Sequence, residues 1–134
     1  LYERLLDRIE ELCRPSKLVS GRVSWFGDGI TASGLSAGEH EGLALNLWPG
    51  TDAGYNNATT QKWMRQTRAG KPPTILVKLL GRSRYTTAID VGPAGHTGRA
   101  LDFSLPLVEA MGWSGSNFPT DRTGTAYFIP YGCR

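Results

Sequence analysis

The start of the chain alternates apolar and charged positions with the period of an α-helix. Tyr2, Leu5, Ile9 and Leu12 recur at intervals of three, four and three residues, and the positions between them are mostly charged. Pro15 ends this pattern. We expect an amphipathic helix that packs on the rest of the domain. A fragment of coiled coil from an upstream stalk, which would allow oligomers, is the alternative.

Most of the remaining chain has the pattern of short β-strands. Apolar or alternating runs occupy residues 17–26, 42–48, 74–80, 84–91 and 124–130. Glycine-rich or proline-containing segments separate them, which is typical of a protein with many turns.

Two further helices are predicted between these strands. Residues 58–69 form a helical pattern, with Asn57 as a possible N-cap, Gly70 as a left-handed exit and Pro72 beyond. A shorter helix near residues 105–112 ends at Gly112.

Composition fits a single small domain. The chain has 134 residues, 40% of them hydrophobic, with 17 glycines and 8 prolines. No apolar run approaches the roughly 20 residues of a membrane span. No zinc, phosphate-loop, dinucleotide or Ser-His-Asp signature is present, so we expect no metal and no cofactor. The first residue is Leu1, and we expect the domain to derive from a longer or processed protein.

The two cysteines, Cys13 and Cys133, lie near opposite ends of the chain. Chain termini often lie close together, so we expect a disulfide between them, with two inert thiols as the alternative. A bridge would indicate an oxidising location.

Positive charge is concentrated in the middle of the chain, although the net charge is only +3. No acidic residue occurs between Asp52 and Asp90. The basic residues of this belt are Lys62, Arg65, Arg68, Lys71, Lys78, Arg82 and Arg84. Such a belt favours polyanions, either an anionic bacterial wall or nucleic acid, unless it is simply a solvated surface. Its aromatic residues do not follow a single-strand-binding motif, so nucleic acid is the less favoured partner.

The order of several short motifs resembles a known family. The motifs are Val23-Ser24-Trp25-Phe26-Gly27, Thr31-Ala32-Ser33-Gly34, Gly81-Arg82, Asp90-Val91-Gly92-Pro93, Gly98-Arg99, Asp102-Phe103-Ser104 and Gly112. Together they resemble the rare lipoprotein A group, which shares a double-psi β-barrel with expansins, small endoglucanases and one class of lytic transglycosylases. The resemblance implies a six-stranded double-psi β-barrel over residues 18–134, preceded by a helix and linker at 1–17.

The resemblance also implies a function on cell-wall polysaccharide, with peptidoglycan as the partner. Asp102 is the expected general acid, because it matches an aspartate of the family groove and lies between apolar neighbours that can raise its pKa. Asp90 is its expected partner as base or orienting group. Turn formation by Asp90 and capping of the next helix by Asp102 are the structural alternatives. An extracellular, periplasmic or virion-associated location follows from this function.

The chain departs from the lytic members of the family at two places. Leu35 occupies the position of a usual Glu, and Asn46 lies in a region where a His is usual. Glu39, His40 and Glu41 are the residues that could compensate. A non-catalytic wall-binding or structural module, such as part of a phage tail, is therefore the alternative to a lytic transglycosylase or glycosidase.

Further polar and aromatic residues are candidates for substrate binding. They are Thr31, Asp28, His96, Tyr55 and Trp63. Turn formation and simple solvation are the structural alternatives for Asp28 and His96. Tyr55 and Trp63 lie in polar sequence and are expected on the surface, whereas Trp25, which alternates within a strand, is expected in the core.

Overall fold

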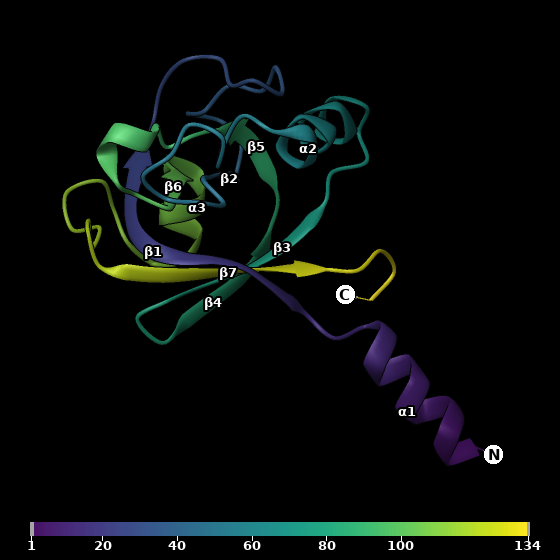
Figure 1. The fold of residues 1–134 in the computed structure, drawn as a ribbon. Coiled ribbons are helices and arrows are strands. Elements are labelled where there is room, and N and C mark those ends of the chain that lie inside the picture. The colour runs from purple at the N-terminus through teal and green to yellow at the C-terminus, as the bar shows by residue number, and fades with distance from the viewer. Residues whose placement is uncertain (1, 134) are drawn as a thin grey trace.

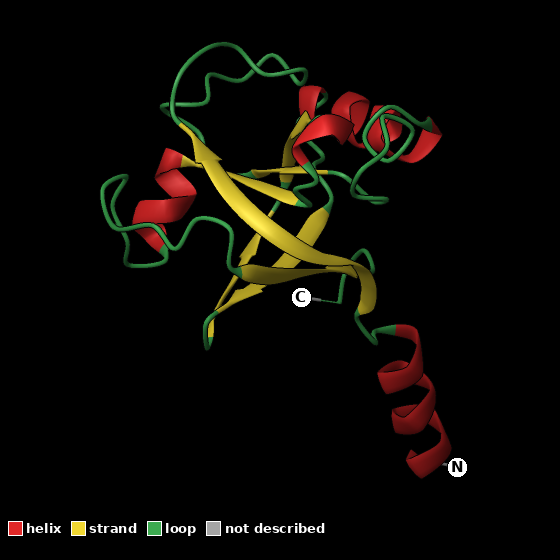
Figure 2. Cartoon of the chain, turned by 60° about the vertical axis from the view of Figure 1, so that its left-hand side comes forward, coloured by secondary structure: helices red, strands yellow, loops and turns green. Residues whose placement is uncertain are grey.

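The computed structural model describes residues 2–133, which form mainly β-strands (Figure 1). In chain order the elements are α1 (Tyr2–Leu12), β1 (Ser16–Phe26), β2 (Leu43–Leu45), α2 (Ala58–Arg68), β3 (Thr74–Leu79), β4 (Arg82–Thr86), β5 (Ala88–Val91), the short 3-10 helix η1 (Gly95–Thr97), β6 (Leu101–Ser104), α3 (Leu105–Ala110) and β7 (Thr123–Ile129). The strands curl around one core, and α2 and α3 cover its ends (Figure 2).

The strands form a single mixed sheet of seven strands in the order β4-β3-β7-β1-β6-β2-β5. Two pairs, β1–β6 and β2–β5, are parallel, and the other pairs are antiparallel. The strands at the two edges, β4 and β5, are separated in the chain only by Thr87. The sheet must therefore curl until its edges approach each other, which gives a barrel-like fold.

The structure has seven strands rather than the six that the sequence predicts. The run 84–91, expected as one strand, is divided at Thr87 into β4 and β5, and these pair with different neighbours. Strand β2 is also shorter than expected, and the side chain of Asn46, which follows it, bonds to the backbone of Thr51, Pro93 and Trp48.

The core consists of the inward-facing residues of the curled sheet. Its largest fully buried side chains include Phe103, Leu43, Leu45, Ile75 and Leu101. Alternate positions of β1, β3 and β7 contribute the rest, as expected for strands with one buried face. Burial of these apolar side chains is the main source of stability.

The predictions for the second and third helices are confirmed. Asn57 caps α2 by accepting a hydrogen bond from the Thr60 backbone N–H at 3.0 Å. The Thr60 hydroxyl in turn accepts a hydrogen bond from the Asn57 backbone N–H, which completes a capping box. Gly70 has a φ of 77°, a left-handed conformation that disfavours other residues. Gly112, with a φ of 93°, follows α3 in the same way.

The N-terminal helix forms as predicted, but its expected packing on the barrel is wrong. No residue of α1 is buried, and the helix projects away from the strands in both ribbon views (Figures 1 and 2). Only residues 13–15 separate α1 from β1, and Pro15 fixes its own φ. The apolar face of α1 is not covered by the sheet, and Leu5 and Ile9 are 55% and 57% exposed.

The predicted disulfide between Cys13 and Cys133 is confirmed. Cys13 precedes β1 and Cys133 follows β7, and these two strands are antiparallel neighbours with Ser16 opposite Phe128. The bridge therefore closes the open end of this strand pair.

Within the described residues, no helix is long and apolar enough to span a bilayer.

We predict that reduction of the disulfide lowers the free energy of unfolding by roughly 3–5 kcal/mol, because the bridge closes a loop of 120 residues and so restricts the unfolded chain. Denaturant unfolding with and without reductant measures this. The matched control is Cys13→Ala/Cys133→Ala, whose stability should equal that of the reduced protein and ignore reductant. An unchanged unfolding midpoint in fully reduced wild-type protein would contradict the prediction.

Candidate functional site

Four residues from neighbouring strands form a row across the sheet. Ser24 of β1 is opposite Asp102 of β6, Asp102 is opposite Ala44 of β2, and Ala44 is opposite Asp90 of β5. Their neighbours Val23, Leu101, Leu43 and Leu45 are fully or almost fully buried in the core. Because side chains alternate along a strand, the row lies on the opposite face of the sheet from these residues, where Ser24 and Ala44 are also buried.

The register therefore brings the two predicted aspartates together with Ala44 between them. Two strand spacings separate Asp90 from Asp102, or roughly 10 Å between Cα atoms. Ala44 has no polar side chain that could separate the two charges. Their mutual repulsion is one cause of the raised pKa of Asp102.

Asp102 is partly buried and has an unusual acidity. Burial raises the pKa of its carboxyl to about 6, and the charge of Asp90 adds to this effect. The Ser24 hydroxyl donates a hydrogen bond of 2.9 Å to Oδ1 of Asp102 and opposes the rise in pKa, as does the nearby charge of Arg99. Asp102 can therefore hold a proton near neutral pH and release it with little cost.

Asp102 does not serve as a helix cap, the structural alternative considered for it. Ser104 is the N-cap residue of α3, and its side chain makes no capping bond. Instead, the Ser104 hydroxyl accepts a 2.9 Å hydrogen bond from the Gly42 backbone N–H. The Asp102 carboxyl is bonded only to Ser24 among the described residues, and is thus available to a ligand.

Asp90 has a demonstrable structural role. Its Oδ1 accepts hydrogen bonds from the backbone N–H groups of Ala32 and Val91, each at 2.9 Å. The first of these bonds holds the turn 31–34 over the end of β5. Asp90 therefore has a structural role in holding the turn 31–34, and its part in any reaction stays a prediction.

Thr31 belongs to the same turn and is buried. Its hydroxyl bonds to the Leu35 carbonyl at 2.8 Å and to the Ser33 hydroxyl at 2.9 Å. These bonds close the turn and occupy the hydroxyl that was expected to bind a sugar. Thr31 therefore shapes the site by holding the turn that Asp90 anchors.

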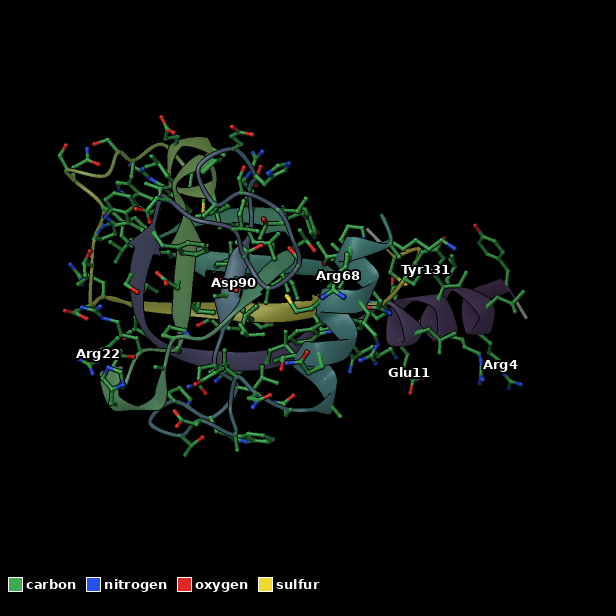
Figure 3. All side chains as sticks on the ribbon, turned by 90° about the horizontal axis from the view of Figure 1, so that it is seen from above. Arg4, Glu11, Arg22, Arg68, Asp90 and Tyr131 are labelled. Atoms are coloured by element: carbon green, nitrogen blue, oxygen red, sulfur yellow. A yellow bond between two sulfur atoms is a disulfide. The ribbon has the colours of Figure 1, made fainter. Side chains whose placement is uncertain are left out.

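Helix α2 packs beside this turn and brings a positive charge to it. The Thr67 hydroxyl donates a 2.7 Å hydrogen bond to the Ala88 carbonyl of β5. The guanidinium of the next residue, Arg68, donates a hydrogen bond to the Ala32 carbonyl at 3.0 Å. Figure 3 shows Arg68 on α2 and Asp90 on the sheet beside it. The backbone of Ala32 thus links a cation of the basic belt to the carboxylate of Asp90.

The remaining sequence candidates lie in different places. Asp28 is exposed, His96 is exposed within η1, and Tyr55 is half-buried in the loop before α2. Trp63 is only 5% exposed and packs in the core, so its expected surface position is wrong. It lies on the inner face of α2, and its polar neighbours in the sequence gave no indication of this.

Trp25 shows the reverse error, because it is 36% exposed rather than buried.

The three residues considered as compensation for the missing groups are not gathered at Asp102. Glu41 forms an ion pair with Arg84, the imidazole of His40 bonds to the Ser36 carbonyl at 3.1 Å, and Glu39 is exposed.

The sequence analysis named Ser24 and Arg99 within motifs and Asn46 as a departure, but assigned none of them to the site. Ser24 bonds directly to Asp102, but its motif did not indicate this contact before the register was known. Arg99 acts on Asp102 through its charge and is held by Asp121 at 3.0 Å. Asn46 is fully buried and bonds to Thr51, Pro93 and Trp48. For Asn46, the signal available in the sequence was a single Asn within an apolar run.

No group of His, Cys, Asp and Glu side chains within residues 2–133 has the arrangement of a metal site.

Comparison with known proteins gives a fold relative and no family. No family model and no curated protein matches the sequence. Among solved structures, a Streptomyces papain inhibitor (SPI) is similar with a TM-score of 0.56 over 83% of this chain and 93% of that chain, at 14% identity. At this identity the similarity supports a shared fold.

We predict that Asp102→Asn stabilises the protein by roughly 2–3 kcal/mol at pH 7 and changes stability little at pH 3. The native pKa of Asp102, about 6, lies above its unfolded value. The stability from this group is thus full at low pH and is lost as pH rises through 6. Asn keeps an oxygen that can accept the Ser24 hydrogen bond but carries no charge.

Denaturant unfolding at several pH values, together with NMR titration of the Asp102 carboxyl carbon, measures this effect. The control is Glu109→Gln, which removes an exposed carboxylate from α3 and should leave the pH dependence unchanged. An Asp102 that titrates near pH 4, or a variant no more stable than wild type at pH 7, would show that burial does not perturb this group.

Proposed function

We propose that this domain is a double-psi β-barrel that cleaves the glycan strands of peptidoglycan, with Asp102 as the general acid. The observation that carries the proposal is the partly buried Asp102 carboxyl, whose pKa of about 6 suits proton transfer near neutral pH. It lies on the opposite face of the sheet from the buried Leu101, bonded to Ser24, with Asp90 two strands away.

The topology supports the double-psi assignment. Parallel pairs β1–β6 and β2–β5 occur within a curled, mostly antiparallel sheet, and three of the sequence motifs that resemble the rare lipoprotein A group fall at β1, β5 and β6. Strands β4 and β5, separated by Thr87 alone, correspond to the single strand that the sequence resemblance implies. The Streptomyces papain inhibitor supports the barrel-like fold and says nothing about peptidoglycan.

A lytic transglycosylase reaction needs one group that first gives and then takes a proton. Protonated Asp102 donates its proton to the glycosidic oxygen as the bond from that oxygen to C1 breaks. The 6-hydroxyl of the same sugar then attacks C1 and transfers its proton to the Asp102 carboxylate. The products are a free chain end and a 1,6-anhydro sugar, no water is consumed, and Asp102 is again protonated.

The alternative hydrolytic reaction would require Asp90 as a base that activates water. The Cα separation of roughly 10 Å is nearer the carboxyl spacing of inverting glycosidases than the roughly 5 Å of retaining ones. However, Oδ1 of Asp90 already accepts two backbone N–H bonds. This favours the reaction with one acid, in which Asp90 orients the turn 31–34.

The disulfide is compatible with an extracellular, periplasmic or virion-associated location. Peptidoglycan is accessible from each of these. A wall-degrading part of a phage tail is one setting that fits the proposed substrate.

We predict that wild-type protein releases soluble anhydromuropeptides from isolated sacculi and that Asp102→Asn releases at least 100-fold less, because Asn cannot supply the proton. Mass spectrometry of the soluble fraction identifies the products. Glu109→Gln is the matched control and should keep full activity. Equal release by Asp102→Asn and wild type would contradict the assignment, while products without the anhydro group would indicate hydrolysis.

A non-catalytic wall-binding module is the second candidate, and the surface of α2 favours it. Lys62 and Arg65 of α2, and Lys71 shortly after it, are exposed and form no ion pair within the described residues. No acidic residue lies between residues 53 and 89 to neutralise them. This face can hold an anionic wall polymer whether or not the domain cleaves glycan.

We predict that binding to sacculi weakens steeply as salt rises to physiological strength, because exposed charges are screened beyond roughly 8–10 Å. Lys62→Ser/Arg65→Ser/Lys71→Ser should reduce affinity and flatten the salt dependence in a pull-down assay. The matched control, Arg4→Ser/Arg8→Ser/Arg14→Ser, removes as many cations from the region of α1 and should bind normally. Binding that ignores salt would exclude an electrostatic role for α2, and tighter binding to DNA would indicate a nucleic-acid partner.

A further inference from the structure

Trp25 is a large aromatic side chain that the barrel leaves in contact with solvent. It lies near the end of β1, two residues after Val23, which is completely buried. Both side chains point to the same face of the strand, so Trp25 continues the core face where the barrel ends. Its side chain is 36% exposed, whereas its register partner Phe103 is buried.

Two glycines hold the Trp25 ring in place. A Cβ atom at Gly115 would lie 2.8 Å from Cζ2 of the indole, and one at Gly27 would lie 3.0 Å from Cζ3. Only residues without a side chain allow the backbone to approach the ring this closely. The ring is therefore supported by main chain, and its remaining surface is open to solvent.

The exposed part of Trp25 faces an open hollow of about 510 Å³. The hollow is lined by Trp25, Phe26, Gly27, Asp28 and Leu105. Asp28 is exposed and makes no hydrogen bond or ion pair among the described residues, so both oxygens of its carboxylate can accept bonds from a ligand. A volume of this size fits a small ligand.

We infer that this hollow is a binding subsite for one pyranose ring of a glycan, separate from the Asp102 site. The C–H face of a pyranose packs on the face of an aromatic ring, whose surface is electron-rich. Sugar hydroxyls at the rim of the pyranose ring can donate hydrogen bonds, and the Asp28 carboxylate would accept them. Phe26 and Leu105 add apolar surface to the same hollow.

The subsite and the proposed acid lie on opposite faces of β1. Ser24 bonds to Asp102, and Trp25 is the next residue along the strand, so its side chain points to the other side. The choice of a wall glycan as ligand rests on the proposed function, but the hollow itself does not depend on Asp102. Loss of the acid should therefore leave sugar binding at Trp25 intact.

The test uses the N-acetylglucosamine tetrasaccharide as probe and the Asp102→Asn protein, which should not cleave it. NMR titration follows the indole N–H signals of the tryptophans, with the Trp25 signal assigned by its loss in Trp25→Phe. We expect the Trp25 signal to shift and Trp25→Ala to weaken binding at least tenfold. Asp28→Asn, an exposed change that leaves the core untouched, should weaken binding about threefold.

Matched controls come from the same chain. Trp48→Ala removes another exposed tryptophan that does not line the hollow, and Glu39→Gln removes another exposed carboxylate from the loop that holds Asp28. Each should change affinity less than twofold.

The outcomes separate this inference from the proposed function. A tetrasaccharide that does not bind, or binds without a Trp25 shift and equally well to Trp25→Ala and Asp28→Asn, overturns the subsite even if wild type releases anhydromuropeptides. A Trp25-dependent interaction in a protein that releases nothing from sacculi keeps the subsite and overturns the proposed cleavage. Preferential binding of an aromatic peptide to the same residues would overturn the sugar assignment.

Discussion

Strand β6 is hydrogen-bonded on one side to β1 in parallel and on the other to β2 in antiparallel orientation, and this double pairing fixes the site. One face of β6 places Leu101 and Phe103 in the core, and the other presents Asp102 between Ser24 and Ala44. A shift of either pairing by one residue would move the carboxyl to the core face and the apolar residues out of it. Burial of Leu101 and Phe103 therefore sets the position of Asp102.

Ionisation of Asp102 in this position is electrostatically unfavourable, and the surrounding groups offset this only in part. A partly buried carboxylate near a second one is unfavourable when ionised, and one hydrogen bond from Ser24 does not offset the burial. Arg99 reduces the cost through its charge, but its guanidinium is bonded to Asp121 rather than to Asp102. A fully compensated carboxylate would have an ordinary or low pKa, so the incomplete compensation is what leaves the pKa of Asp102 at about 6. Groups of this kind commonly reduce stability in exchange for function.

The sequence predicted the parts of the fold that depend on local chemistry. The caps of α2, the glycine exits, most strands and the disulfide follow from residue types at particular positions. It could not predict features set by long-range packing. Trp63 is buried and Trp25 exposed because of which surfaces meet, and the apolar pattern of α1 did not reveal that the helix has no buried residue.

The same division holds for the site. The resemblance brought Asp90 and Asp102 to one place, and the register agrees, since both are opposite Ala44. Ser24 and Arg99 could not be recognised in advance, because they are 78 and 3 residues from Asp102 in sequence and act through a strand pairing and a charge. Thr31 was chosen for its hydroxyl, but only the folded turn shows that this hydroxyl is already bonded.

The central claim is that Asp102 acts in its protonated form. The pH dependence of anhydromuropeptide release at substrate concentrations well below saturation tests it most directly. If Asp102 is the acid, the rate should fall about tenfold per pH unit above an inflection that matches its pKa of about 6. A rate that stays constant or rises between pH 6 and pH 8 would contradict this account.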